Sequence, residues 1–470
     1  MGFQYLHNAN GIVSPLVPLV MFGWVPIVFA LFIKFPPSRA VVIGFVSAWL
    51  FLPEVGLPLP GLPDYEKISA TSYIILLAAI LYDAGRLNSF RPSLIDIPMV
   101  IWCLCPVATS LSNGLGLYDG FSAALSHIVS WGLPYFLGRI YLNSLSGLKQ
   151  LATGIFVGGL AYVPLCLFEV RMSPQLHAIF YGSLPHDDFA QTIRYGGYRP
   201  NVFLQHGLAV GAWMMAASLI GICLWKTGSL KKLKNIKIEW LLSLLLVTFV
   251  LTKSTGAYFL LILGIGILFT GFSLQSSIPA IATVGAIFAY LYMNAGTESY
   301  ITDQLVDYLS NIFPPERIQS LEFRFNNEEI LSDHARQRII WGWGGWDRSS
   351  VIDPNTGKAA IQDSRWVIAF GRNGMVGLIS LFTALTLPVI AFCVRYPAHL
   401  WKRKNVAPVA GLTIALLLYT IDCLLNAMIN PIYILACGGI AGLVIQSPVR
   451  KRKTAAYLNS LNKTEPLLSK

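Results

Sequence analysis

Charged side chains are scarce in this sequence. Lys, Arg, Asp and Glu make up 12% of its 470 residues, whereas hydrophobic residues make up 55% and the mean hydropathy is +0.60. A soluble domain carries about 25% charged residues. The scarcity excludes an ordinary soluble protein. The remaining charges gather between apolar runs of about 15–25 residues, the length that crosses about 30 Å of hydrocarbon.

Cysteine is also sparse, and motifs for metal or nucleotide binding are lacking. The seven cysteines all fall inside or at the ends of apolar runs, which favours small buried hydrophobic side chains over a disulfide or metal framework. No Asp-x-Asp motif and no nucleotide-binding loop is present. We therefore expect neither a metal nor a cofactor. Run 11–33 is too long for the core of a cleavable signal peptide and lacks its basic flank, so we expect it to be the first span.

What the sequence does contain is a series of about thirteen apolar runs. They cover residues 11–33, 40–52, 68–82, 97–111, 117–142, 148–168, 202–224, 238–251, 256–272, 278–293, 366–392, 406–425 and 431–445. The fold class they predict is all-α, a polytopic bundle of about 12–13 transmembrane helices in a lipid bilayer. The predicted parts are a bundle of about ten spans (1–294, with an outer loop at 169–201), a large, partly helical extracytoplasmic loop (295–365), C-terminal spans (366–446) and a basic cytoplasmic tail (447–470).

The net charge of +11 mostly reflects topology. Lys and Arg concentrate on the cytoplasmic side of membrane proteins. With about thirteen spans, the basic clusters at 226–237, 395–404 and 450–453 fall on one side, and the N-terminus and loop 295–365 fall on the other. Each cluster is short and adjoins a span, so we expect no nucleic-acid partner.

The long loop has signs of a folded structure. Pro314-Pro315-Glu316 is a good helix start, with Ile318, Leu321 and Phe325 at helical spacing after it. Residues 341–346 (Trp-Gly-Trp-Gly-Gly-Trp) then predict a glycine turn at the membrane interface. A folded loop of this size is typically functional.

Four places contain residues that can bind or transfer a charged group. The first is residues 194–200 (Arg-Tyr-Gly-Gly-Tyr-Arg-Pro), followed by 201–206 up to His206 at a span start, where an arginine is either a phosphate ligand or a snorkelling interfacial side chain. The second is Lys253 in a short turn, either a ligand or a plain anchor. The third is a charged helix in the long loop, whose arginines either bind a ligand or form salt bridges. The arginines of this helix and of the residues just after it are Arg317, Arg324, Arg336 and Arg338.

The fourth place is Asp363-Ser364-Arg365-Trp366, directly before a span. Asp363 fits a general base, a helix N-cap, or both. Asp422, Asn426 and Asn430 lie in or between the last two spans, where polar groups either mark a functional site or bond neighbouring helices.

At these residues the chain resembles the O-antigen ligase and O-antigen polymerase superfamily of bacterial envelope glycosyltransferases. The resemblance covers residues 198–378. The matching motifs are Tyr198-Arg199-Pro200, the turn 252–257 (Thr-Lys-Ser-Thr-Gly-Ala), Arg324, residues 340–344 (Ile-Trp-Gly-Trp-Gly) and residues 374–378 (Gly-Met-Val-Gly-Leu). Each motif is short, and their order and spacing carry the match.

The resemblance implies a membrane glycosyltransferase at the outer face of the cytoplasmic membrane. Such an enzyme takes a glycan from a polyprenyl-diphosphate-linked donor, passes it to a hydroxyl of a saccharide acceptor, and works beside envelope polysaccharide assembly proteins. The catalytic residues implied are Asp363, Arg199 and Arg324. The candidate substrate-binding residues are Tyr198, His206, Lys253, Arg336, Arg338 and Trp366. Arginine forks suit a diphosphate leaving group, and an acceptor hydroxyl needs a nearby base.

The chain departs from the family pattern at two points. Ligases usually carry a His-Asn pair where this chain has Asp363-Ser364, and the turn that commonly ends in Arg has Thr255 here. The missing histidine favours a polymerase or a ligase-like relative that uses a carboxylate. Two other classes stay open: a transporter or exporter of an anion or saccharide with Asp422 on its path, and a scaffold without chemistry. No inverted repeat, typical of transporters, is apparent.

The charge pattern generates a test of topology. Because the basic clusters alternate consistently with the spans, loop 295–365 should be extracytoplasmic and the tail after Arg450 cytoplasmic. Single cysteines introduced at exposed loop positions, labelled with a membrane-impermeant thiol reagent in intact cells, check this. Labelling of the tail without labelling of loop 295–365 would invert the predicted topology.

Overall fold

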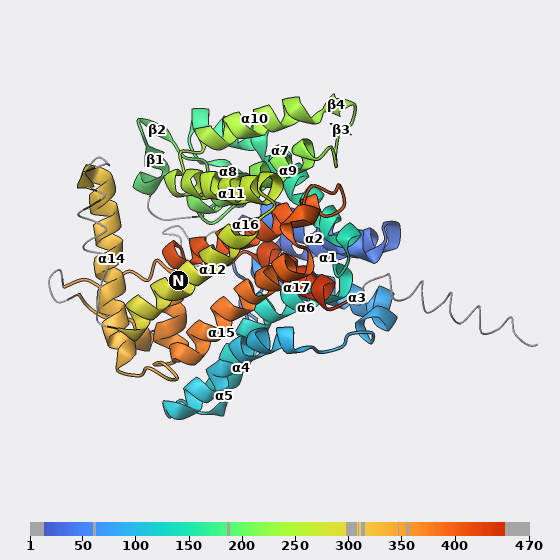
Figure 1. The fold of residues 1–470 in the computed structure, drawn as a ribbon. Helices are drawn as coiled ribbons and strands as arrows, with labels where there is room; N and C mark the ends of the chain where they lie inside the picture. The colour runs from blue at the N-terminus through green and yellow to red at the C-terminus, as the bar shows by residue number, and fades with distance from the viewer. Residues whose placement is uncertain are drawn as a thin grey trace, which may run out of the picture.

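The computed structural model describes residues 14–59, 63–185, 189–297, 308, 310–311, 315–345, 347–353 and 357–446, with backbone alone at 315–317 and 320–321. Helices cover most of these residues (Figure 1). The α-helices are α1 (Leu16–Lys34), α2 (Pro37–Phe51), α3 (Lys67–Leu87), α4 (Ile97–Ser112), α5 (Leu117–His127), α6 (Leu133–Tyr141), α7 (Leu145–Met172), α8 (Leu176–Tyr181), α9 (Gly207–Lys226), α10 (Ile238–Leu251), α11 (Thr255–Ser273), α12 (Ile278–Leu291), α14 (Pro315–Arg336), α15 (Arg365–Arg395), α16 (Ala407–Leu425) and α17 (Pro431–Ile445).

The other elements are short. Two antiparallel hairpins pair β1 (Ile193–Arg194) with β2 (Gly197–Tyr198) and β3 (Lys232–Leu233) with β4 (Ile236–Lys237). The 3-10 segments are Leu94–Asp96, Phe189–Thr192, Asp347–Ser349 and Ala398–Leu400, and the π-helical segments are Ile128–Gly132 and Tyr292–Gly296.

The predicted all-α membrane fold is confirmed. Within the described residues, nine helices are long and apolar enough to cross a membrane, and α2, α10 and α17 are shorter apolar helices. Each predicted apolar run corresponds to helix, although most bounds differ by a few residues, as where run 68–82 is the helix Lys67–Leu87; two differences alter the element itself. Run 117–142 is α5 and α6 joined through the π segment. Run 202–224 begins its helix at Gly207, because His206 has an extended backbone (φ −156°) and caps the helix with its side chain.

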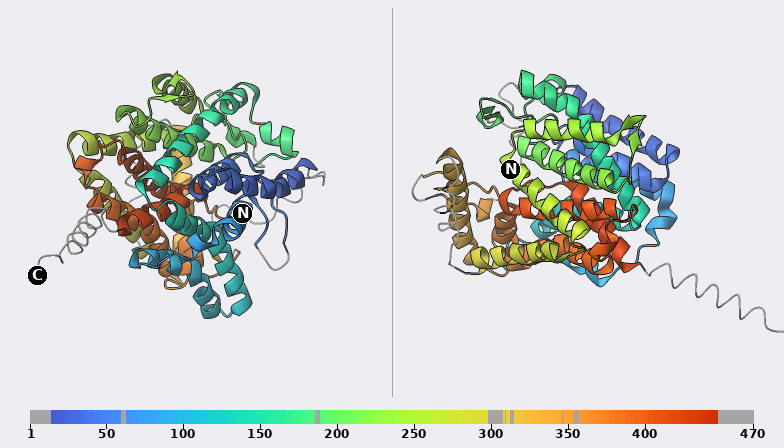
Figure 2. Two further views of the ribbon diagram at one scale, coloured as in Figure 1. Left: turned by 90° about the vertical axis from the view of Figure 1, so that its right-hand side faces the viewer. Right: turned by 45° about the horizontal axis from the view of Figure 1, so that its top comes forward.

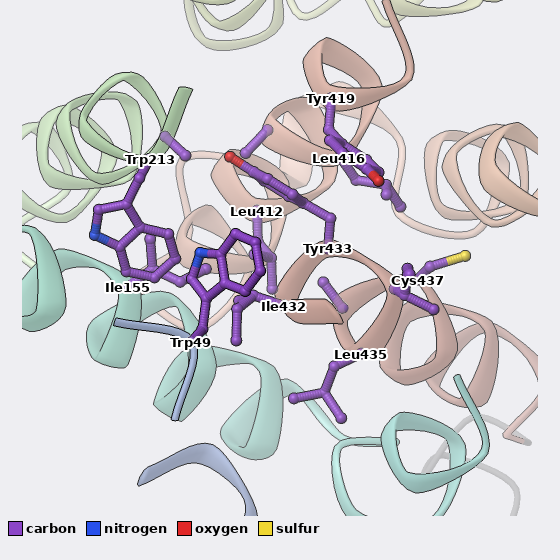
Figure 3. Close-up of a cluster of buried hydrophobic side chains, with 14 of the residues drawn as sticks. Trp49, Ile155, Trp213, Leu412, Leu416, Tyr419, Ile432, Tyr433, Leu435 and Cys437 are labelled. Carbon is purple, nitrogen blue, oxygen red and sulfur yellow. The ribbon is translucent and has the colours of Figure 1, made fainter. Parts of the chain in front are cut away.

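The centre of the bundle is formed by α9, α16 and α17, which are buried over most of their length. Figure 3 shows Trp49, Ile155, Trp213 and Leu412 packed around α17. By contrast, α1 and α12 are mostly exposed in this structure and present large apolar side chains outward. An exposed apolar helix face is stable against lipid tails, so these helices fit the periphery of a membrane bundle.

Helix α17 crosses α6 at the distance of backbone contact. A Cβ added at Gly138 would lie 2.1 Å from the Leu435 carbonyl oxygen, and one added at Gly438 would lie 2.0 Å from the Tyr135 carbonyl oxygen. Small residues allow this approach between membrane helices, where dispersion contacts replace the hydrophobic effect as the driving force.

The seven cysteines are buried and free, as predicted.

The extramembrane elements are gathered at two ends of the bundle. Helix α14 lies at one side of the bundle, against α15 and the end of α12, and the β1–β2 hairpin lies on that same side (Figures 1 and 2). The β3–β4 hairpin, with Lys232 and Lys237, lies at the opposite end. The structure thus places the basic cluster 226–237 away from α14 and the β1–β2 hairpin. The tail 447–470, with cluster 450–453, lies outside the described residues, and the side of the membrane on which each element lies stays a prediction.

Candidate functional site

The first two places singled out in the sequence form one structural unit. The Lys253 Nζ donates hydrogen bonds to the carbonyl oxygens of Arg194 (3.1 Å) and Tyr195 (3.5 Å), and the hydroxyls of Tyr195 and Thr255 are 3.0 Å apart. The turn between α10 and α11 therefore holds the tip of the β1–β2 hairpin. Lys253 is an anchor for this hairpin, and a role for it in ligand binding stays a prediction.

Arg199 lies inside the protein, with 5% of its surface exposed. Its Nη2 donates to the Ser254 Oγ at 3.2 Å, and its side chain packs on Gly207, where an added Cβ would lie 2.6 Å from the Arg199 Cδ. A snorkelling arginine extends its guanidinium into water, whereas this guanidinium is buried at the turn. The structure thus joins Arg199 to the second motif, beside the N-terminus of α9.

A buried carboxylate fixes the segment after Arg199. Glu169 is fully buried; its Oε2 accepts the backbone N–H groups of Asn201 (2.8 Å) and Val202 (2.7 Å), and its Oε1 accepts that of Leu176 (2.9 Å). Three N–H donors satisfy the charge that burial would otherwise disfavour. Glu169 was not identified from the sequence, because nothing in the sequence marks which carboxylate receives donors from a distant loop.

His206 and Tyr198 have local structural contacts. His206 is the N-cap of α9: its Nδ1 accepts the Leu208 N–H at 3.0 Å, so its Nε2 carries the proton that it shares with the Gln191 Oε1 at 3.0 Å. Tyr198 ends the hairpin, with its ring 6.4 Å from that of Phe189. Substrate contacts of both side chains stay predictions.

The arginines of the long loop do not share one environment. The Arg336 Nη2 donates to the carbonyl oxygens of Asn294 and Thr297, both at 2.9 Å, and Arg336 also pairs with Asp333. The Arg338 guanidinium lies 4.9 Å above the Trp343 ring, where it is exposed. These contacts tie α14 to the end of α12 and to the glycine turn. The side chain of Arg317 is outside the described residues.

Arg324 belongs to a different group, which we term the acid–arginine cluster: Arg324, Glu328, Asp422 and Asn426. The Arg324 Nη1 donates to the Leu425 carbonyl oxygen at 3.2 Å, and its charge lies within electrostatic reach of Glu328 and Asp422. The Asn426 Nδ2 donates to the Asp422 Oδ1 at 2.7 Å. A cation at the C-terminus of α16 is favourable because the last carbonyls of a helix are unsatisfied.

Glu328 is the residue that sequence reasoning missed. Its Oε2 accepts the Tyr290 hydroxyl at 2.9 Å and its Oε1 accepts the Trp366 Nε1 at 3.2 Å, while Ser364 lies beside it. Burial raises the pKa of Glu328 to about 7, against the lowering effect of these donors and of Arg324. Its position one helical turn after Arg324 was a usable signal, but its burial required the packing of α12 and α15.

Trp366 orients this carboxylate. The indole is fully buried and meets the Tyr290 ring edge-on, with centroids 5.9 Å apart. A substrate contact was expected of Trp366. Its place in the structure is beneath Glu328, where it donates a hydrogen bond and fixes the position of the carboxylate.

Asp363 is not the N-cap that its position suggested. Helix α15 begins at Arg365 with Ser364 as its N-cap, and the Asp363 N–H donates to the Ile361 carbonyl oxygen at 3.1 Å. The Arg365 N–H, at the first turn of the helix, donates to the Asn426 carbonyl oxygen at 3.2 Å. Asp363 is thus near the cluster in sequence and partly exposed, and its role as a base stays a prediction.

The two glycine motifs meet inside the bundle. Helix α15 is interrupted at Gly374, with φ 63° and ψ −163°. The interruption frees backbone groups that the 339–344 turn satisfies: the Met375 N–H donates to the Ile339 carbonyl at 2.7 Å, and the Trp343 N–H donates to the Gly371 carbonyl at 2.9 Å. A Cβ at Gly342 would lie 2.5 Å from the Gly374 nitrogen, so both positions exclude a side chain.

Within the described ranges, no group of three or more His, Cys, Asp or Glu side chains is arranged to hold a metal ion.

No model of a known protein family matches this chain, and no curated protein matches it. The fold therefore defines a multi-pass helical membrane protein, without assignment to a family.

The buried Glu328 generates a pH prediction. Its pKa is about 7 in the folded protein against an ordinary 4.5, so the folded state binds more protons than the unfolded state between these values. The free energy of unfolding should therefore fall as pH rises from about 4.5 to about 7. Glu328→Gln keeps an acceptor oxygen and does not titrate. Relative to this variant, the free energy of unfolding of wild type should fall by on the order of 3 kcal/mol across this pH window.

Thermal unfolding of the detergent-purified protein at a series of pH values measures this difference. Glu322→Gln, at an exposed carboxylate of the same helix, is the matched control and should run parallel to wild type. If wild type and Glu328→Gln also run parallel, Glu328 is not a buried titrating group.

Proposed function

We propose that this protein transfers or polymerises glycan from a polyprenyl-diphosphate-linked donor onto a sugar hydroxyl, with the acid–arginine cluster as the reaction site. The observation that carries the proposal is the convergence of α12, α14, α15 and α16 on one buried carboxylate and one arginine. The motif resemblance to envelope glycosyltransferases supports the same reaction class. The proposed location is the outer face of the cytoplasmic membrane.

The reaction needs two groups that the cluster contains. The acceptor hydroxyl attacks the anomeric carbon of the donor sugar, its proton passes to a carboxylate, and the bond between that carbon and the diphosphate oxygen breaks. Arg324 is suited to stabilise the negative charge that develops on the leaving diphosphate. Glu328, whose pKa is about 7, is suited to accept the proton, because a base works best when its pKa lies near the working pH.

Asp363 is the alternative base. It precedes Ser364, which lies beside Glu328, so both carboxyl groups are near the N-terminus of α15. The proposal favours Glu328 because Tyr290 and Trp366 fix its carboxylate, whereas Asp363 is partly exposed. Arg199 lies at the N-terminus of α9 rather than on α14, and its contact with the donor diphosphate is a separate proposal.

Transfer assays with purified protein, a lipid-diphosphate-linked glycan and a saccharide acceptor test these roles. Glu328→Gln should lower the rate about a hundredfold or more, because it removes the proton acceptor and keeps the shape. The wild-type rate should rise with pH and level off above about 7, the pKa of Glu328. Arg324→Ala should cost a similar factor, since a charged contact to the leaving group is lost.

The control variants separate chemistry from folding. Arg171→Ala removes an exposed arginine from the last turn of α7 and should leave the rate unchanged, as should Glu322→Gln. If Asp363→Asn is inactive while Glu328→Gln is active, Asp363 is the base. If folded wild type moves saccharide across the membrane of reconstituted vesicles and makes no glycosidic bond, the protein is a transporter and the proposed reaction is wrong.

A further inference from the structure

Two arginines of α15 lie on a face that the proposed reaction does not use. Arg365 and Arg372 are about two helical turns apart, so their side chains leave the same face of the helix. The Arg365 guanidinium lies 6.0 Å from the centroid of the Trp131 ring, in the π segment after α5. Both arginines are within electrostatic reach of His127, the last residue of α5.

The Arg365 guanidinium has no hydrogen-bond or ion-pair partner in the described part of the chain. Its Nε is buried and unbonded. Its polar neighbours are Tyr419 and Cys423, and the Tyr419 hydroxyl already donates to the Met428 carbonyl and accepts the Asn430 N–H. A cation in apolar surroundings is costly unless an anion or a set of acceptors compensates it.

The second arginine adds to this cost. Arg372 lies close enough to Arg365 for the two charges to repel, and Asp347 is the acidic side chain within its electrostatic reach. His127 is stacked on Trp102 with ring centroids 4.3 Å apart, and its Nδ1 is 2.9 Å from the Trp102 carbonyl oxygen. With Nδ1 donating to that carbonyl, the Nε2 is left for a ligand, and an arriving anion would favour its protonation.

We propose that Arg365, Arg372 and His127 form a binding site for a phosphate-type oxyanion. Guanidinium groups bind phosphate oxygens through paired N–H donors, and a site with two arginines and a histidine offers donors from three side chains. All three side chains are partly exposed, so a ligand can reach them. A bound oxyanion would supply the counter-charge that Arg365 lacks and would reduce the repulsion between the two arginines.

This site is separate from the acid–arginine cluster. The end of α16 lies between them: Arg324 contacts the carbonyl of Leu425, and the Arg365 N–H contacts the carbonyl of Asn426. The proposal does not rest on glycan transfer. The oxyanion has two sources with the same chemistry, a soluble or lipid-linked diphosphate and the phosphate head group of a bilayer lipid.

Calorimetric titration of inorganic pyrophosphate into the full-length protein in neutral detergent tests the first source. Wild type should bind, and Arg365→Gln and Arg372→Gln should each weaken binding at least tenfold. Arg365→Lys should weaken it less, because it keeps the charge and loses the fork. Arg171→Gln, the exposed control, should bind like wild type, and gel filtration verifies that each variant is folded.

Nanodiscs of phosphatidylcholine with and without phosphatidylglycerol test the second source. If phosphatidylglycerol stabilises wild type thermally but stabilises neither Arg365→Gln nor Arg372→Gln, and pyrophosphate does not bind, the ligand is a lipid head group. Loss of binding in Arg324→Ala alone, equal binding by wild type and the α15 variants, or no response to either probe would overturn the site.

Discussion

The arrangement of this protein depends on one constraint: backbone N–H and C=O groups away from water must be hydrogen-bonded within the protein. Helix α15 breaks this continuity at Gly374, and the 339–344 turn restores it by bonding to both sides of the break. The Thr109 hydroxyl of α4 and the side chain of Asn113, its C-cap, donate to the carbonyls of Trp341 and Gly342 and hold the turn from the other side. An extramembrane loop is thereby built into the bundle.

The candidate site follows from that docking. Because residues 339–344 are fixed against α15, helix α14 directly before them is held against α15 and the π segment that follows α12. Arg324 then reaches the C-terminus of α16, and Glu328 reaches Tyr290 and Trp366. Arg199 is held by an independent set of contacts, with Ser254 and with the segment that Glu169 binds, so the two arginines belong to two separately supported structures.

The sequence was sufficient for the helices and insufficient for the site. Apolar length alone predicts α10 and α17 with the bounds that the structure has, because each run ends at polar or turn residues. Asp422 was identified because charge is rare within the spans, and Arg324 because it is a matching position of the family resemblance. Glu328 and Arg365 were not assigned roles, since one lies among other acidic residues and the other beside Asp363. Their burial depends on which helices pack together, and that is not encoded in any single run.

Locating a bound donor tests directly whether the acid–arginine cluster is the site of the proposed reaction. A lipid-diphosphate-linked saccharide with a photoreactive group on its first sugar can be cross-linked to the purified protein and the labelled peptides identified by mass spectrometry. If the acid–arginine cluster is the reaction site, labels fall in α14 around Arg324 and Glu328 and in the segment after α16, and unlabelled donor suppresses them. Labels confined to other regions, such as the β1–β2 hairpin or the β3–β4 end, would contradict it.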